Sequence, residues 1–180
     1  RGRLPKSLGK RSFFGRSYHG TLSNLTVLDL GTNYLGGNLP GGLGGFRLLT
    51  RLELENNQFS GEIPELGSLK KLRNLLLSKN ALVGKLPKSL SKLISLERLE
   101  LDHNRLGGEL TSELNVISSL SKLRVLDLSN NQYKGLIETE NFALLTNLEY
   151  LALKANNLSG TFPDFSILQS LAVLDLRKNL

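Results

Sequence analysis

A leucine pattern that returns at a nearly fixed interval constrains the fold of this chain more than any other feature. The pattern is L-x-x-L-x-L-x-x-N-x-L-x-G, and its third copy consists of Leu72, Leu75, Leu77, Asn80, Leu82 and Gly84. Successive asparagines are 23 to 27 residues apart. They are Asn33, Asn57, Asn80, Asn104, Asn131, Asn156 and Asn179. A fixed period of this length is the signature of a solenoid or another repeat array.

The residue types in each copy predict its local structure. The L-x-L segment alternates, which places its two leucines on one side of a short strand. The asparagine comes where the chain leaves that strand, and its amide has both donors and an acceptor for backbone groups of its own turn and the next. We therefore expect a ladder of buried asparagines. No copy can bury its own leucines, so stacking of copies must do so.

The second half of the repeat carries a resemblance to a known family. Four copies continue as G-x-[aliphatic or Phe]-P, at Gly37–Pro40, Gly61–Pro64, Gly84–Pro87 and Gly160–Pro163. This resembles the plant-specific class of leucine-rich repeats over residues 22–180. The resemblance implies an α/β solenoid: a right-handed superhelix with a parallel concave sheet and turns or short helices on the convex side. It also implies an extra strand near the G-x-I-P segment.

The chain divides into two parts in this interpretation. Residues 1–21 are a remnant of an earlier repeat plus an irregular basic segment, and residues 22–180 are one continuous solenoid of about six full repeats and a truncated one. Aligning Gly2–Phe14 with Gly84–Leu96 predicts that about 13 residues of a repeat are missing, with an irregular connection between Phe14 and Leu22. The fourth repeat is longer, and Ser112–Leu123 predicts a short amphipathic helix on the convex side.

The composition excludes several classes of protein. The chain has no cysteine, which excludes disulfides, thiolate metal sites and a cysteine nucleophile. No apolar run is long enough to span a bilayer. The chain begins with Arg1, contains no Met, and has no capping segment at either end, which suggests a fragment of a longer protein. In that case we expect any membrane span to lie outside this segment. The alternative is a short divergent protein whose ends are covered by pairing.

The net charge of +7 comes from the N-terminal end. Six basic residues and no acid occur within residues 1–28, and the rest of the chain is nearly neutral. A basic end attracts nucleic acid, anionic lipid or pectin-like polyanions. A solvated end without a partner is the simpler interpretation, so we expect no nucleic acid partner and no membrane contact within this segment.

The outward strand positions predict a binding surface. In the family, ligands bind on the concave face or along its edge, and here that face alternates arginines with carboxylates before becoming basic. The candidate ligand-binding residues are Arg51, Glu53, Glu55, Arg98, Glu100, Asp102, His103, Tyr150 and Lys154. Such a surface suits a peptide with both signs of charge. Mixed charge is equally what the exposed strands of any solenoid show.

Catalysis is not expected from these residues. The backbones of Glu53 and Glu55 are roughly 7 Å apart on one strand, which overlaps the carboxylate spacing of inverting glycosidases. A catalytic acid needs a raised pKa, whereas an open sheet offers little burial and neighbouring arginines lower carboxylate pKa values. His19 and His103 are the only histidines, so no metal site or histidine-based triad is expected, and no cofactor. Gly41–Gly45 lacks the G-K-[ST] of a P-loop.

Two sequons are candidates for glycosylation. They begin at Asn24 and Asn157, and neither has proline in the middle position. Both would carry glycans in a secreted protein. The resemblance implies an extracellular location, at the plasma membrane or in the apoplast.

Three functions are consistent with these features. The first is a non-catalytic recognition module from a plant receptor-like protein or receptor kinase ectodomain, in signalling or defence, that binds a peptide or protein through its concave face and possibly a co-receptor. The second is a soluble secreted inhibitor of a cell-wall polysaccharide hydrolase, similar to polygalacturonase inhibitors. The third is ice binding, which favours a regular row of one small residue, such as threonine. No outward column has such a row.

Overall fold

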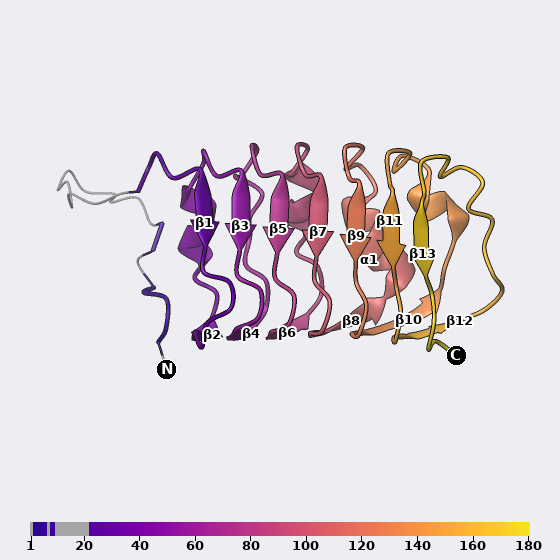
Figure 1. Cartoon of the computed structure of the whole chain (residues 1–180), viewed down its shortest axis with the longest axis horizontal. Helices are drawn as coiled ribbons and strands as arrows, with labels where there is room; N and C mark the ends of the chain where they lie inside the picture. The colour runs from indigo at the N-terminus through magenta and orange to yellow at the C-terminus, as the bar shows by residue number, and fades with distance from the viewer. Residues whose placement is uncertain (1, 7, 10–21) are drawn as a thin grey trace.

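Two parallel β-sheets form the frame of the molecule (Figure 1). The computed structural model describes residues 2–6, 8–9 and 22–180. The seven-stranded sheet consists of β1 (Val27–Asp29), β3 (Arg51–Glu53), β5 (Asn74–Leu76), β7 (Arg98–Glu100), β9 (Val125–Asp127), β11 (Tyr150–Ala152) and β13 (Val173–Asp175). The six-stranded sheet consists of β2 (Gly36–Asn38), β4 (Gln58–Gly61), β6 (Ala81–Gly84), β8 (Arg105–Glu109), β10 (Gln132–Leu136) and β12 (Asn157–Ser159).

The leucine core lies between these two sheets and the convex segments. The central leucine of a strand pairs in register with its counterpart one repeat on, as Leu52, Leu75 and Leu99 do. All three are fully buried, and so is the second leucine of each of these repeats. The convex segments are the short 3-10 helices η1 (Gly41–Gly45), η2 (Lys88–Lys92) and η3 (Thr139–Phe142) and one α-helix, α1 (Leu110–Ile117). The predicted α/β solenoid is confirmed, including a second row of strands.

The helix of the fourth repeat differs in extent from the prediction. We expected it over Ser112–Leu123, and α1 covers Leu110–Ile117. It starts earlier because Leu110 takes the buried position that the aliphatic residue of G-x-I-P holds elsewhere. Thr111 replaces the proline, which would disfavour a helical backbone at the residue before it. Ser118–Leu123 instead form the turn that leads into β9.

The described N-terminal residues occupy the repeat immediately before β1 and β2. Arg3 forms a parallel bridge with Gly36 of β2, and the Gly36 N–H donates to the Gly2 carbonyl at 2.9 Å. Every strand of the six-stranded sheet pairs with its counterpart one repeat away. Arg3 therefore marks the position of such a counterpart in the preceding repeat.

This placement corrects the predicted gap in the repeat. The interval from Pro5 to Pro40 is 35 residues, against 24 for the next interval between repeat prolines. Because Pro5 belongs to the adjacent repeat, that repeat has extra residues, and the predicted loss of about 13 residues is wrong. The irregular connection expected between Phe14 and Leu22 falls on residues 10–21, outside the described part of the chain.

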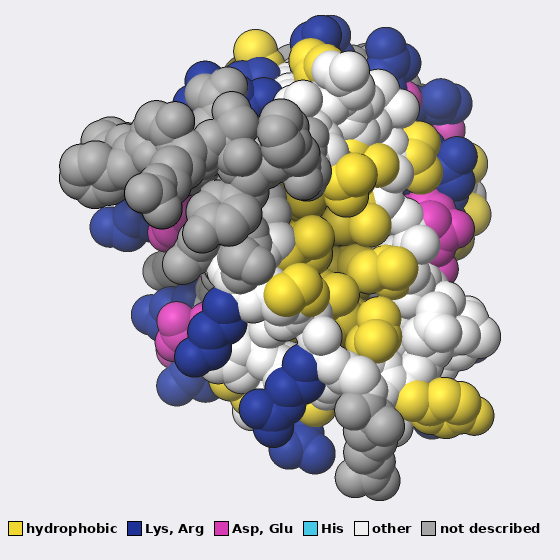
Figure 2. Space-filling view, turned by 90° about the vertical axis from the view of Figure 1, so that its left-hand side faces the viewer, with side chains coloured by type: hydrophobic (Ala, Val, Ile, Leu, Met, Phe, Trp, Pro, Cys, Tyr) yellow, Lys and Arg dark blue, Asp and Glu magenta, His cyan; other side chains and the backbone are white. Residues whose placement is uncertain are grey.

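The end of the stack nearest the N-terminus presents apolar side chains (Figure 2). Four leucines there are only partly buried, whereas their counterparts one repeat on are fully buried. They are Leu25, Leu28, Leu30 and Leu35. Among the described residues, the model has no helix of the length and apolarity that a membrane crossing requires.

Asparagine side chains bind the turns of successive repeats together. The Asn104 Oδ1 accepts the Leu82 N–H at 3.0 Å, and its Nδ2 donates to the Leu77 and Leu101 carbonyls at 3.0 Å each. One amide thus satisfies backbone groups from two repeats in a place that excludes water. We call the set the ladder asparagines, and it consists of Asn33, Asn57, Asn80, Asn104, Asn131, Asn156 and Asn179.

The residue before each ladder asparagine has a left-handed backbone. The φ angles lie between 52° and 59°, although none of these residues is glycine. They are Thr32, Asn56, Lys79, His103, Asn130, Ala155 and Lys178. The left-handed region costs an ordinary L-residue about 1–2 kcal/mol. The tight turn that brings the asparagine inward therefore adds conformational strain in every repeat.

We predict that Ala155→Gly stabilises the chain by about 1 kcal/mol, because glycine adopts a φ of 52° without steric strain. Urea unfolding followed by circular dichroism measures the change. Ala143→Gly is the matched control: Ala143 is exposed with a φ of −53°, and glycine there should lower stability by about 0.5–1 kcal/mol. Equal effects at the two sites would contradict the strain argument.

We predict that Asn104→Ala lowers the free energy of unfolding by about 1–3 kcal/mol, because it leaves the buried Leu82 N–H without its partner and removes one of the two asparagine donors to each of the Leu77 and Leu101 carbonyls. Asn33→Ala is the control, since the Asn33 side chain is exposed and, among the described residues, donates to the Leu30 and Gly31 carbonyls of its own turn. Its cost should stay below about 1 kcal/mol. Similar losses in the two variants would show that bonding between repeats is not the cause.

Candidate functional site

The outward side of the seven-stranded sheet is the candidate site, and we call it the strand face. Three columns of side chains run along it. The first column is Val27, Arg51, Asn74, Arg98, Val125, Tyr150 and Val173. The second is Asp29, Glu53, Leu76, Glu100, Asp127, Ala152 and Asp175. The third, just past the strands, is Gly31, Glu55, Ser78, Asp102, Ser129, Lys154 and Arg177.

The predicted arginines are already paired with carboxylates of their own strands. The Arg51 Nε donates to the Glu53 Oε1 at 2.9 Å, and its Nη2 lies 2.7 Å from the same oxygen. Arg98 and Glu100 form the same arrangement, with an Nε to Oε1 distance of 2.6 Å. Glu53, one of the candidate ligand-binding residues, is only 7% exposed. It is covered because its side chain folds along the strand toward Arg51.

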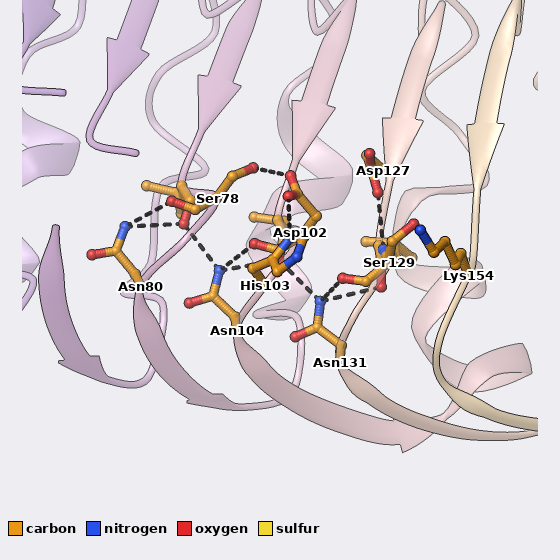
Figure 3. Close-up of polar contacts among 12 residues, drawn as sticks. Ser78, Asn80, Asp102, His103, Asn104, Asp127, Ser129, Asn131 and Lys154 are labelled. Carbon is orange, nitrogen blue, oxygen red and sulfur yellow. Dashed lines mark hydrogen bonds and ion pairs between the residues drawn. The ribbon is translucent and has the colours of Figure 1, made fainter. Parts of the chain in front are cut away.

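Asp102 is the centre of a short polar chain (Figure 3). The Ser78 hydroxyl donates to one Asp102 oxygen, and the His103 Nδ1 lies 2.8 Å from the other. His103 occupies the left-handed position, and its side chain remains about half exposed. The carboxylate stands between serine and histidine, so the histidine does not contact the serine hydroxyl. The order needed to activate a serine nucleophile is therefore not present.

Burial, rather than the neighbouring arginine, dominates the acidity of Glu100. Desolvation raises its pKa, and this exceeds the opposing effect of Arg98. The pKa of Asp127 is likewise raised by burial, against the hydrogen bond that it accepts from the Ser129 N–H at 2.9 Å. We expected little burial and lowered carboxylate pKa values on this face, and for these two groups that expectation is wrong.

The last three repeats give the strand face a different character. Tyr150 lies between Val125 and Val173 in register. Burial raises the pKa of the Tyr150 hydroxyl, and nearby Asp127 and Asp175 add to the shift. Asp175 is engaged by Arg177 through two bonds of 2.8 and 2.7 Å, which lower the pKa of that carboxyl to about 2.

Lys154 is the one predicted cation whose ammonium forms no ion pair with another described residue. Glu55 is its acidic counterpart at the other end of the third column: its Oε2 is buried and has no hydrogen-bond partner among the described residues. The structure thus places all nine predicted residues on one face but divides them into paired and unpaired groups.

No metal centre is built into the described residues, since they contain no cluster of three or more metal-ligating side chains.

A shallow hollow of about 300 Å³ lies beside the strand starts of repeats four to six. It is lined by Glu97, Lys122, Arg124, Asn147, Glu149 and Ser170. Arg124 and Glu149 pair across it through bonds of 2.9 and 3.0 Å, so its charges are largely satisfied. The sequon residues Asn24 and Asn157 are both exposed.

A buried acid on the convex side was not predicted from the sequence, although the structure has one in α1. Glu113 of α1 is 2% exposed, and its Oε2 accepts the Leu86 N–H at 2.7 Å. Burial raises the pKa of Glu113, and the Leu86 bond and Lys85 oppose the shift. The fully buried hydroxyl of Tyr133 has no partner in the described structure, and its pKa is raised by burial and by Glu113. The available signal in the sequence was Glu113 itself, which follows two residues after Thr111, the residue that replaces the repeat proline.

Comparison with protein families and solved structures places these features among known repeats. The Leucine Rich Repeat family model matches residues 24–46, 48–69, 71–93, 95–117 and 122–142. A search of curated proteins found no match to the chain.

Several solved structures superpose on nearly the whole chain. The Arabidopsis receptor kinase HAESA, in complex with the peptide hormone IDA and the co-receptor SERK1, is 34% identical with a TM-score of 0.84. The match covers 99% of this chain and 28% of HAESA. PEPR1, solved with AtPEP1, is 31% identical with a TM-score of 0.75, over 99% of this chain and 27% of that one. A plant ice-binding protein is 26% identical with a TM-score of 0.72, over 99% and 61%.

We predict that the difference in stability between Glu113→Gln and the original chain depends on pH. Because the folded pKa of Glu113 is raised, its contribution to stability is greatest below the unfolded value of 4.5 and falls as pH rises through the folded pKa. Glutamine still accepts the Leu86 N–H but carries no charge. The variant should therefore gain stability relative to the original chain between pH 4 and pH 7.

Urea unfolding of both proteins at several pH values measures this difference. Glu138→Gln, on the exposed loop before η3, is the control and should show no comparable trend. A constant difference for Glu113→Gln across the pH range would contradict the assignment of a raised folded pKa.

Proposed function

Because the chain belongs to the leucine-rich repeat family, we propose that it is a non-catalytic recognition module from the ectodomain of a plant receptor-like protein or receptor kinase. The observation that carries the proposal is the strand face: seven parallel strands present three columns of outward side chains, most of them polar, in fixed register. A rigid, preformed surface binds without a large ordering cost. The ligand class that we propose is an extended peptide or a protein segment, with a co-receptor as a possible second partner.

The comparisons support this choice. Both receptor structures superpose on this chain along its whole length, and HAESA was solved with a peptide hormone and a co-receptor. The chain spans only 28% and 27% of the lengths of those two proteins. That the full protein has a further, membrane-anchored part is therefore also a proposal. We also propose that the chain lies at the cell surface or in the apoplast and carries glycans on the exposed Asn24 and Asn157. Residues 22–180 form one continuous solenoid in this proposal.

The other two functions have less support. An inhibitor of a cell-wall polysaccharide hydrolase would use the same face, but neither of the two receptor kinase structures described above is an inhibitor. The similarity to a plant ice-binding protein raises ice binding, yet the second column of the strand face mixes Asp29, Leu76 and Ala152 instead of repeating one small residue.

Affinity selection with a random peptide library and a polygalacturonase assay separate the first two functions. We expect the immobilised 180-residue chain to retain a defined set of peptides and to leave fungal polygalacturonase activity unchanged. The control is the same chain after heat denaturation, which should retain no defined set. Inhibition of a polygalacturonase with no peptide retained would overturn the proposal in favour of the inhibitor.

A further inference from the structure

The strand face is divided into two electrostatically different halves. In repeats two and four, the charged side chains of the first two columns pair within their own strand, and repeat three has Asn74 and Leu76 in these columns. Over repeats five to seven, the first column becomes Val125, Tyr150 and Val173. The third column gains Lys154, which forms no ion pair with the other described residues.

The paired half offers a ligand little net binding energy. A ligand carboxylate that approaches Arg98 competes with Glu100, whose oxygen lies 2.6 Å from the Arg98 Nε and also pairs with Nη2. The same holds for Arg51 and the largely buried Glu53. Replacing one ion pair by another leaves the electrostatic energy nearly unchanged and adds the cost of stripping water from the ligand.

The unpaired half offers an apolar shelf. Val125, Tyr150 and Val173 are direct neighbours across three parallel strands, so their side chains stand roughly 5 Å apart. Val173 is 45% exposed, and Val125 and Tyr150 are half-buried. A tyrosine flanked by two valines buries a ligand side chain at a small cost in conformational entropy.

Beside the shelf, Ala152 lies between Asp127 and Asp175 in the second column and is 1% exposed, so neighbouring side chains cover its methyl group. Arg177 is already engaged by Asp175, whereas the Lys154 ammonium, two residues beyond Ala152, forms no ion pair with another described residue.

We propose that repeats five to seven form the ligand-reading part of the strand face, where Val125, Tyr150 and Val173 hold an apolar side chain of an extended peptide and Lys154 binds a carboxylate of the same peptide. The proposal rests on the recognition function proposed above and names the ligand chemistry. The carboxylate comes either from an acidic side chain or from a free C-terminus.

The geometry sets the spacing of the two groups on the peptide. Tyr150 and Lys154 are four residues apart along the chain, which is roughly 13 Å in extended backbone. The lysine side chain shortens the distance to be bridged by several ångströms. The apolar residue and the carboxylate of the peptide should therefore be about two to four residues apart.

The test is a selection with the immobilised 180-residue chain from random peptides made with free and with amidated C-termini. Retained peptides should carry an apolar residue about two to four positions from a carboxylate. Enrichment that survives amidation assigns the carboxylate to a side chain, and enrichment lost on amidation assigns it to the C-terminus.

Variants then locate the contact. Tyr150→Ala and Lys154→Ala should each weaken binding of the enriched peptides about tenfold, as expected for an anchor residue. Lys154→Glu should reverse the preference toward basic peptides. The matched controls are Asn74→Ala, in the same column on β5, and Lys122→Ala, an exposed cation off the strand face. Both controls should bind within about twofold of the original chain. Thermal unfolding of every variant separates lost contact from lost fold.

Two results would overturn the inference. If peptides are retained but bind Tyr150→Ala and Lys154→Ala as tightly as the original chain, or if Arg51→Ala or Arg98→Ala causes the tenfold loss instead, the contact lies elsewhere and the recognition function stands. If the folded chain retains no peptide, the recognition function fails as well.

Discussion

The whole stack depends on the hydrogen bonds made by buried asparagine amides. A leucine core is non-directional and does not by itself fix how far one turn is rotated against the next. An amide such as that of Asn104 is directional: it bonds Leu82 from one side and two carbonyls from the other. It therefore joins consecutive turns at a set spacing. The strained backbone of the residue before it is the local cost of placing that amide inward.

Because the leucine core and the asparagine amides hold the repeats together, the side chains of the strand face are free to vary. Each strand contributes its central leucine and the next leucine to the core, whereas the outward side chains lie outside the leucine core. Neighbouring outward residues are nonetheless held in register by the strands beneath them, as Tyr150 is with Val125 and Val173. Such a surface can differ between repeats without altering the fold, and here it changes from paired charges to an apolar shelf.

The sequence predicted those parts of the structure that depend on local chemistry. Alternating leucines predicted the strands, and a polar amide at the end of a strand predicted the role of Asn80 and its counterparts. Other features depend on contacts that a repeat pattern does not encode. The burial of Glu53 follows from a side-chain conformation, and the raised pKa of Glu100 from how deeply neighbouring strands cover it. The position of Arg3 beside Gly36 required the pairing of two segments far apart in sequence.

Some ion pairs form within one repeat, and others join two adjacent repeats. Arg51–Glu53 and Arg98–Glu100 close within a single strand, so either repeat carries both partners with it. Arg73–Glu97 and Arg124–Glu149 join adjacent repeats instead. Duplication or loss of a repeat during evolution leaves the pairs within one strand intact. It leaves one residue of a pair between repeats without its partner. Recombination within such a gene is therefore electrostatically neutral at some repeat junctions and unfavourable at others.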